Sequence, residues 1–153
     1  MKLRLLWVGK TRAGWLRDGI DEYAGRLRRY APLEIVEVKE EKGFAPGEQR
    51  LREGERLARA IPPTAQLILL DERGEEPTSP ELAAFIGKSR DSGVPELAFV
   101  IGGAYGFSDE LRSRAHRLLA LSRLTLTHEM ARVVLLEQLY RGFTILNNEP
   151  YHH

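Results

Sequence analysis

The chain has 153 residues, of which 42% are hydrophobic and 29% charged, and this balance excludes a disordered or fibrous protein. Cys is absent, which excludes disulfides and thiolate metal sites. The formal net charge is only +1, which excludes a strongly basic protein of the kind that coats nucleic acid. We therefore expect one α/β domain over residues 1–153, without a metal, in the reducing cytoplasm.

The amino terminus predicts a strand rather than a targeting segment. Its apolar run at 3–9 is interrupted by Arg4, and it lacks the longer apolar core and the small-residue cleavage site of a signal peptide. No apolar stretch elsewhere is long enough to span a bilayer. The sequence thus predicts no membrane attachment.

Strand-like apolar runs alternate with amphipathic helical segments along the whole chain. Alternation of this kind predicts a mostly parallel sheet with helices on both faces. In chain order the predicted elements are a strand at 3–9, a helix at 13–30, strands at 33–38 and 66–72 separated by a helix at 46–61, a helix at 78–93, a strand at 96–103, a helix at 108–119, a short strand at 124–127 and a helix at 128–146.

Small hydroxyl side chains mark where several helices are expected to begin. Thr78 or Ser79 precedes one helix, which Gly93 is expected to end, and Ser108 precedes another. The last helix, 128–146, is apolar around most of its circumference, so more than one side should be covered. A second copy of the chain would supply part of that cover in a homodimer.

Three loops at the carboxyl ends of predicted strands are the places where a ligand is expected, because parallel sheets bind ligands there. The first is Leu70–Gly74. The second, "IGGAYG", contains Gly102 and Gly103, whose amides are free to donate hydrogen bonds. Its spacing matches neither a dinucleotide fingerprint nor a phosphate loop. A ligand pocket and a simple tight turn both fit this pattern.

The third loop, "LSRLTLT" at 121–127, mixes Leu with small hydroxylic residues. In one interpretation, its backbone groups hydrogen-bond to the edge of an adenine ring while Leu side chains cover the faces of the ring. In the other, the Leu residues belong to the hydrophobic core. His116 is expected on a helix surface and His128 at a helix start. Nucleophile elbows and zinc spacings are absent, so the chain favours a site that positions a reactive cofactor.

Taken together, "WVGK", "DEYAGRLRRY", "LDERG", "FVIGGAYG", "LSRLTLTHEMARVVLLEQLYRGF" and the terminal "PYHH" closely resemble the ribosomal RNA large subunit methyltransferase H family. This family belongs to the SPOUT class. The resemblance runs from the first strand to the last residues. It implies a C-terminal trefoil knot, a homodimer, S-adenosylmethionine as cofactor, and methylation of N3 of a pseudouridine in a hairpin loop of 23S rRNA on the assembled ribosome.

The resemblance also implies the site residues. It places the transferred methyl near Arg141, Tyr151 and His152. From the chemistry of N3 methylation we expect Arg141 to stabilise a uracil anion, Tyr151 to pack on the base, and His152 or water to take the proton. Thr127 and His153 replace the Pro and the basic residue that are common in relatives. The implied cofactor residues are Leu70, Gly102, Gly103, Leu121, Ser122, Arg123, Leu124, Thr125 and Leu126.

Two other interpretations stay open at the level of sequence. One is an enzyme of the same class that methylates a ribose or a tRNA base. The other is a non-catalytic module that binds RNA or a nucleotide. Arginines that recur late in the chain fit an RNA-binding face, but they also fit ordinary solvated helix surfaces.

Overall fold

The computed structural model describes residues 1–153 and contains one parallel five-stranded sheet. The strand order is β2-β1-β4-β3-β5, and every neighbouring pair is parallel. The predicted parallel α/β architecture is therefore confirmed, while the trefoil knot stays a prediction. The strands are β1 (Lys2–Val8), β2 (Leu33–Val38), β3 (Gln66–Glu75), β4 (Glu96–Ile101) and β5 (Arg117–Leu119).

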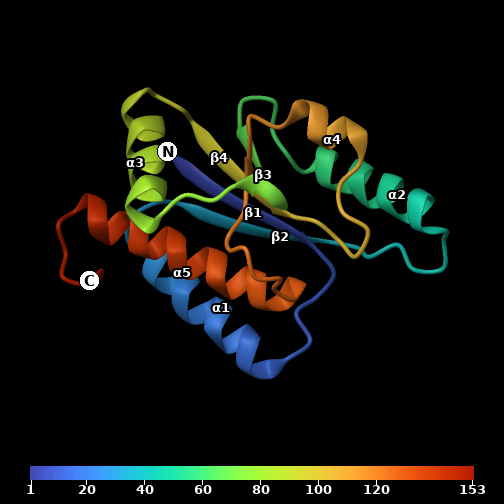
Figure 1. Ribbon diagram of the computed structural model, residues 1–153, viewed down its shortest axis with the longest axis horizontal. Helices are drawn as coiled ribbons and strands as arrows, with labels where there is room; N and C mark the ends of the chain where they lie inside the picture. Colours follow the sequence, from blue (N-terminus) through green and yellow to red (C-terminus); the bar gives the residue numbers. More distant parts are fainter.

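Helices cover both faces of the sheet, as Figure 1 shows. One core joins the sheet to α1 (Gly14–Leu27), α3 (Ser79–Asp91) and α5 (His128–Leu146). A second core on the opposite face joins it to α2 (Pro46–Arg59) and α4 (Asp109–Arg114). None of these helices is both long and apolar enough to cross a membrane.

Hydroxyl caps begin three of the helices. Thr78 Oγ1 accepts a hydrogen bond from the Glu81 amide, and the Glu81 carboxylate accepts one from the Thr78 amide, which completes a capping box. Ser108 caps α4, and Thr127 caps α5 through the Met130 amide. The predicted caps at Thr78 and Ser108 are confirmed. The Thr127 cap gives α5 a defined start.

The helix predicted at 108–119 begins as expected but ends at Arg114, and the fifth strand, Arg117–Leu119, lies where its second half was expected. The strand predicted at 124–127 is wrong. α4 ends at Arg114, and the His116 amide donates to the Leu67 carbonyl while His116 Nδ1 accepts from the Leu67 amide. These bonds draw the chain into register with β3, and β5 follows. His116 is thus a strand-aligning residue instead of a helix-surface one.

β3 is longer than predicted and includes the segment Leu70–Gly74 that was expected to be a loop. Its pairing with β5 shifts register between Leu70 and Glu75, both of which lie opposite Leu119. The extra residues arch out of the ladder and return to it. This arch forms one wall of the site described below.

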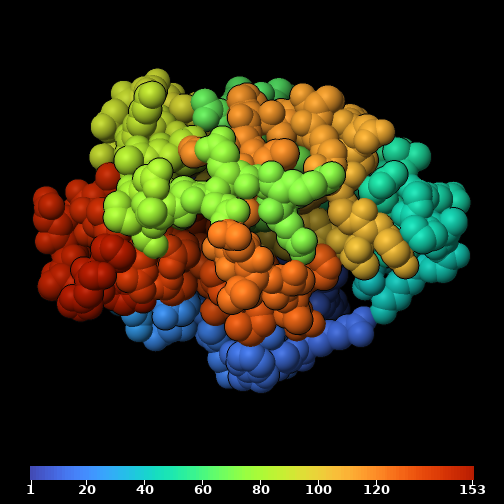
Figure 2. All heavy atoms as spheres, in the orientation of Figure 1, coloured from blue at the N-terminus to red at the C-terminus, as the bar shows by residue number.

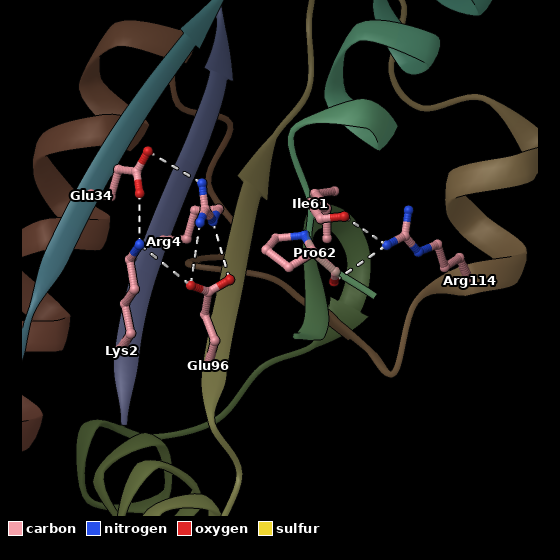
Figure 3. A network of polar contacts seen from close by, with 7 residues as sticks. All are labelled: Lys2, Arg4, Glu34, Ile61, Pro62, Glu96 and Arg114. Atoms are coloured by element: carbon pink, nitrogen blue, oxygen red, sulfur yellow. Dashed lines mark hydrogen bonds and ion pairs between the residues drawn. The ribbon is translucent and has the colours of Figure 1, made fainter. Parts of the chain in front are cut away.

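Ion pairs join the starts of three strands at the edge of the sheet opposite the site, as Figure 3 shows. Glu96 on β4 is almost buried and lies 3.1 Å from Arg4 and 3.7 Å from Lys2 of β1. Glu34 on β2 contacts the same two cations at 2.7 and 3.3 Å. Both carboxylates bridge neighbouring strands, which satisfies the buried charge of Glu96.

Arg114 ties α4 to the end of α2 and to the residues that follow it, and Figure 3 shows its contacts with Ile61 and Pro62. Its guanidinium donates to the carbonyls of Ala58 and Ile61 at 3.3 and 3.0 Å. The last carbonyls of a helix lack partners within the helix, so a cation there is favourable. This contact fixes the two helices that cover the second face.

Gly74 lies where the β3 arch crosses β5, and we expect Gly74→Ala to destabilise the protein by about 1–3 kcal/mol. A Cβ at this position would meet backbone atoms of Leu118 and Leu119 at 2.6 Å, and backbone gives way less easily than a flexible side chain. Urea unfolding measures the change. Gly25→Ala is the control, because it lies within α1 with open space around it, and it should stabilise slightly. Equal stability of the two variants would contradict the expected crossing.

Candidate active site

The three predicted ligand loops meet around one cleft of about 500 Å³ at the carboxyl edge of the sheet. In Figure 2 the light-green chain that follows Leu70 crosses the molecule above the orange chain that leads to α5. The β4–α4 loop closes the cleft from a third side. The lining residues are Leu70–Arg73, Ile101–Phe107, Arg112, Leu119–Ser122, Leu124–Leu126, His128 and Ala131.

All but one of the residues expected to hold the cofactor line this cleft. They are Leu70, Gly102, Gly103, Leu121, Ser122, Leu124, Thr125 and Leu126. Arg123 is the exception, because its side chain is 86% exposed and its nearest acidic partner is Glu76 at 3.9 Å. The structure thus brings eight of the predicted cofactor residues together in one cleft. That they bind the cofactor remains a prediction.

An ion pair at the mouth of the cleft was not predicted from the sequence. Arg112 Nη1 lies 2.7 Å from Asp71 Oδ2, while Asp71 Oδ1 accepts from the Arg73 amide at 2.8 Å. Burial acts to raise the pKa of Asp71, but the hydrogen bonds from Arg73 and Arg112 outweigh it and leave this pKa below its usual value. The ionised pair therefore clamps the β3 arch to α4.

The first turns of α5 hold the loop that follows β1. Glu129 Oε1 accepts from the amides of Arg12 and Ala13 at 2.7 and 3.1 Å. The Ala13 bond is the largest cause that lowers the pKa of Glu129, and the Arg12 bond adds to it. Arg132, only 2% exposed, donates to Thr11 Oγ1 and the Val8 carbonyl, both at 2.7 Å. These contacts hold the start of α5, which lines the cleft, to the loop that follows β1.

The three residues expected near the transferred methyl gather in a second cluster at the far end of α5. Arg141 Nη2 lies 2.6 Å from Glu137 Oε1, and Arg141 Nη1 lies 3.1 Å from His152 Nδ1. The Arg141 guanidinium also lies 4.7 Å from the centre of the Tyr151 ring. Tyr140 packs edge-on against Tyr151, with ring centres 4.8 Å apart.

Charges in this cluster are fixed by its contacts. Hydrogen bonds to Glu137 are the largest cause that raises the pKa of Arg141, so it stays cationic. Burial, with added effects of Tyr23 and Glu137, raises the pKa of Tyr151. The phenol is therefore neutral at physiological pH and is a poor proton acceptor there. Since Arg141 can only donate, His152 Nδ1 is the acceptor in this contact.

The second cluster and the cleft lie apart within one chain. Ala131 lines the cleft and Arg141 lies ten positions further along α5, which corresponds to about 15 Å at the rise of a helix. Figure 1 shows the C-terminus beside the end of α5 remote from the loop that precedes this helix. Arg141, Tyr151 and His152 are all absent from the cleft lining.

The whole chain matches a known family. A family model described as a predicted SPOUT methyltransferase matches residues 1–152. The chain belongs to the SPOUT methyltransferase family. The resemblance inferred from the motifs is thereby confirmed.

Curated relatives in this family carry a more specific name. The ribosomal RNA large subunit methyltransferase H of Geobacter metallireducens is 67% identical over 153 residues, which are 100% of this chain and 99% of that protein. The protein of the same name from Geobacter sulfurreducens is also 67% identical, with full coverage of both chains. A solved structure of a probable methyltransferase from Bordetella pertussis has a TM-score of 0.58 at 14% identity and covers 92% of this chain and 95% of that one. This likeness supports the fold alone.

Proposed function

We propose that this SPOUT methyltransferase transfers a methyl group from S-adenosylmethionine to N3 of a pseudouridine in a hairpin loop of 23S rRNA, on the assembled ribosome in the cytoplasm. The observation that carries the proposal is the cleft at the carboxyl edge of the sheet, built by the three loops that the resemblance to the family leads us to expect around the cofactor. Full-length relatives named ribosomal RNA large subunit methyltransferase H support the RNA substrate.

The cleft suits a nucleoside cofactor. Its volume of about 500 Å³ lies within the range of small-molecule sites, and 11 of its 21 lining residues are hydrophobic. The Gly102–Gly106 turn and the 121–126 loop would hold the adenosine part through backbone groups, with Leu124 and Leu126 beside the ring. When bound, the cofactor supplies an activated methyl on sulfur, so the protein needs mainly to align the acceptor and exclude water.

A complete active site requires a second chain in this proposal. The Arg141 cluster cannot reach the cleft of its own chain, because both are built on the rigid helix α5, about 15 Å apart. A two-fold axis near the middle of α5 would place the partner's Arg141, the partner's Tyr151 and the partner's His152 at this chain's cleft. The homodimer is thus the arrangement in which cofactor and tail residues meet.

The cluster has the chemistry that methylation of a uracil nitrogen needs. N3 must lose its proton, and cationic Arg141 stabilises the resulting anion. Neutral Tyr151 offers its ring to the target base. The N3 proton passes to water, or to His152 after this ring has released Arg141, because the hydrogen bond at 3.1 Å occupies the Nδ1 lone pair in this structure.

We expect ribosomes to be far better substrates than the naked hairpin, by about a hundredfold or more in kcat/KM. With a net charge of +1 the protein gains little from phosphate contacts alone, so binding must also use the shape of the ribosome. Transfer of labelled methyl groups to both substrates measures the ratio. Mass mapping of the modified nucleotide tests the site, and a methylated ribose or tRNA base would contradict the proposed substrate.

A further inference from the structure

Glu53 is a buried carboxylate on α2 with one oxygen fully engaged and the other without any partner. Glu53 as a whole is only 2% exposed to solvent. Oε2 accepts from the Glu41 amide at 3.1 Å and from Gln49 Nε2 at 3.0 Å. Oε1 is buried and makes no hydrogen bond. The neighbouring cation Arg56 forms its ion pair with Glu41 and not with Glu53.

The free oxygen points at the turn that lines the cleft. A Cβ built on Gly103 would come within 2.5 Å of Glu53 Oε1, so the carboxylate lies directly against this glycine. Gly103 begins a turn that is closed by a hydrogen bond from the Gly106 amide to the Gly103 carbonyl at 3.2 Å. The amides of Ala104 and Tyr105 at the tip of the turn have no acceptor in the protein.

An unpaired buried carboxylate oxygen is costly, and folded proteins rarely retain one without a reason. Here Glu53 Oε1 is an acceptor that has no donor. It lies against a turn in which the amides of Ala104 and Tyr105 have no acceptor in the protein. Ala104 and Tyr105 are exposed in this structure, so the turn must move toward Glu53 to join one of these amides to Oε1. The same turn forms the wall against which the ligand of the cleft must pack.

We propose that Glu53 is a positioning residue for the cofactor. When the adenosine part of S-adenosylmethionine packs on the Gly103–Gly106 turn, Glu53 Oε1 accepts a hydrogen bond from a backbone amide of that turn and stabilises its bound conformation. The inference rests on the proposed cofactor site and extends it to a residue outside the cleft lining. Gly103 is required because any side chain would separate the turn from the carboxylate.

Glu53→Gln tests this inference without removing the contacts that hold α2. Glu41 and Gln49 both donate, so the amide oxygen of the new side chain must face them and its NH₂ group must face Gly103. The acceptor beneath the turn is then lost. We expect the calorimetric Kd for S-adenosylmethionine and for S-adenosylhomocysteine to rise about tenfold or more, with Tm close to that of the wild type.

Glu55→Gln is the matched control, because Glu55 lies on the same helix, is exposed and pairs only with Arg59 at 3.8 Å. It should bind the cofactor as the wild type does. Hydrogen exchange gives a second readout: the cofactor should protect the amides of Ala104 and Tyr105 in the wild type and much less in Glu53→Gln. A purely structural role of Glu53 would leave this cofactor-induced protection unchanged.

Gly103→Ala gives an independent variant that separates the turn from Glu53. Its effect on Kd should not add to that of Glu53→Gln in the double variant, because both remove one interaction. Cofactor affinity of Glu53→Gln equal to that of Glu55→Gln, or additive effects, would overturn the inference while leaving the proposed function intact. Failure of the wild type to bind either ligand would instead contradict the proposed function, and the inference with it.

Discussion

Removal of Tyr151–His153 is expected to lower methyl transfer to the ribosome by at least about a thousandfold while leaving cofactor affinity and the fold unchanged. The deletion removes the Tyr151 ring beside Arg141 and the His152 imidazole that is hydrogen-bonded to Arg141. The target base is then no longer held in position, and the N3 proton has lost one possible acceptor. The cleft formed by each chain keeps all its own lining residues, because none of them belongs to the tail of that chain.

Three measurements check this expectation on the same protein. Labelled methyl transfer gives the activity, calorimetry gives the Kd for S-adenosylmethionine, and thermal unfolding gives Tm. Deletion of His153 alone is the matched control, since this residue is exposed and makes no hydrogen bond or ion pair. Near-normal activity of the longer deletion would show that the tail takes no part in transfer.

Much of the fold could be predicted from the sequence because its signals are local. Apolar runs and helix caps such as Thr78 and Ser108 each act within a few residues, and the structure confirms them. β5 could not be predicted in this way. Its three residues become a strand only because His116 bonds to both backbone groups of Leu67, which lies 49 positions away.

The site shows the same division between local and long-range signals. The carboxyl-edge rule for parallel sheets identified the three loops that line the cleft. The Asp71–Arg112 ion pair and the placement of Glu53 against Gly103 depend on how α4 and α2 pack on the sheet, which no sequence pattern shows. The distance between the tail cluster and the cleft likewise follows from the straight course of α5.

That distance leads to the second prediction: two inactive variants should restore activity when their chains are mixed. Arg141→Ala removes the cation from the tail cluster. Thr125→Trp fills the cleft with an indole, and because Thr125 is exposed at the lining, this change should leave the fold intact. Each homodimer then lacks one half of every site, and each alone should be inactive.

A mixed dimer carries one site in which an intact cleft faces an intact tail, and one site in which both halves are damaged. If chains exchange at random, half of the dimers are mixed and about a quarter of all sites are intact. Refolding or coexpression of the two variants at equal amounts should therefore recover about a quarter of wild-type methyl transfer. If cleft and tail of the same chain worked together, every site in every mixture would stay damaged and no activity would return.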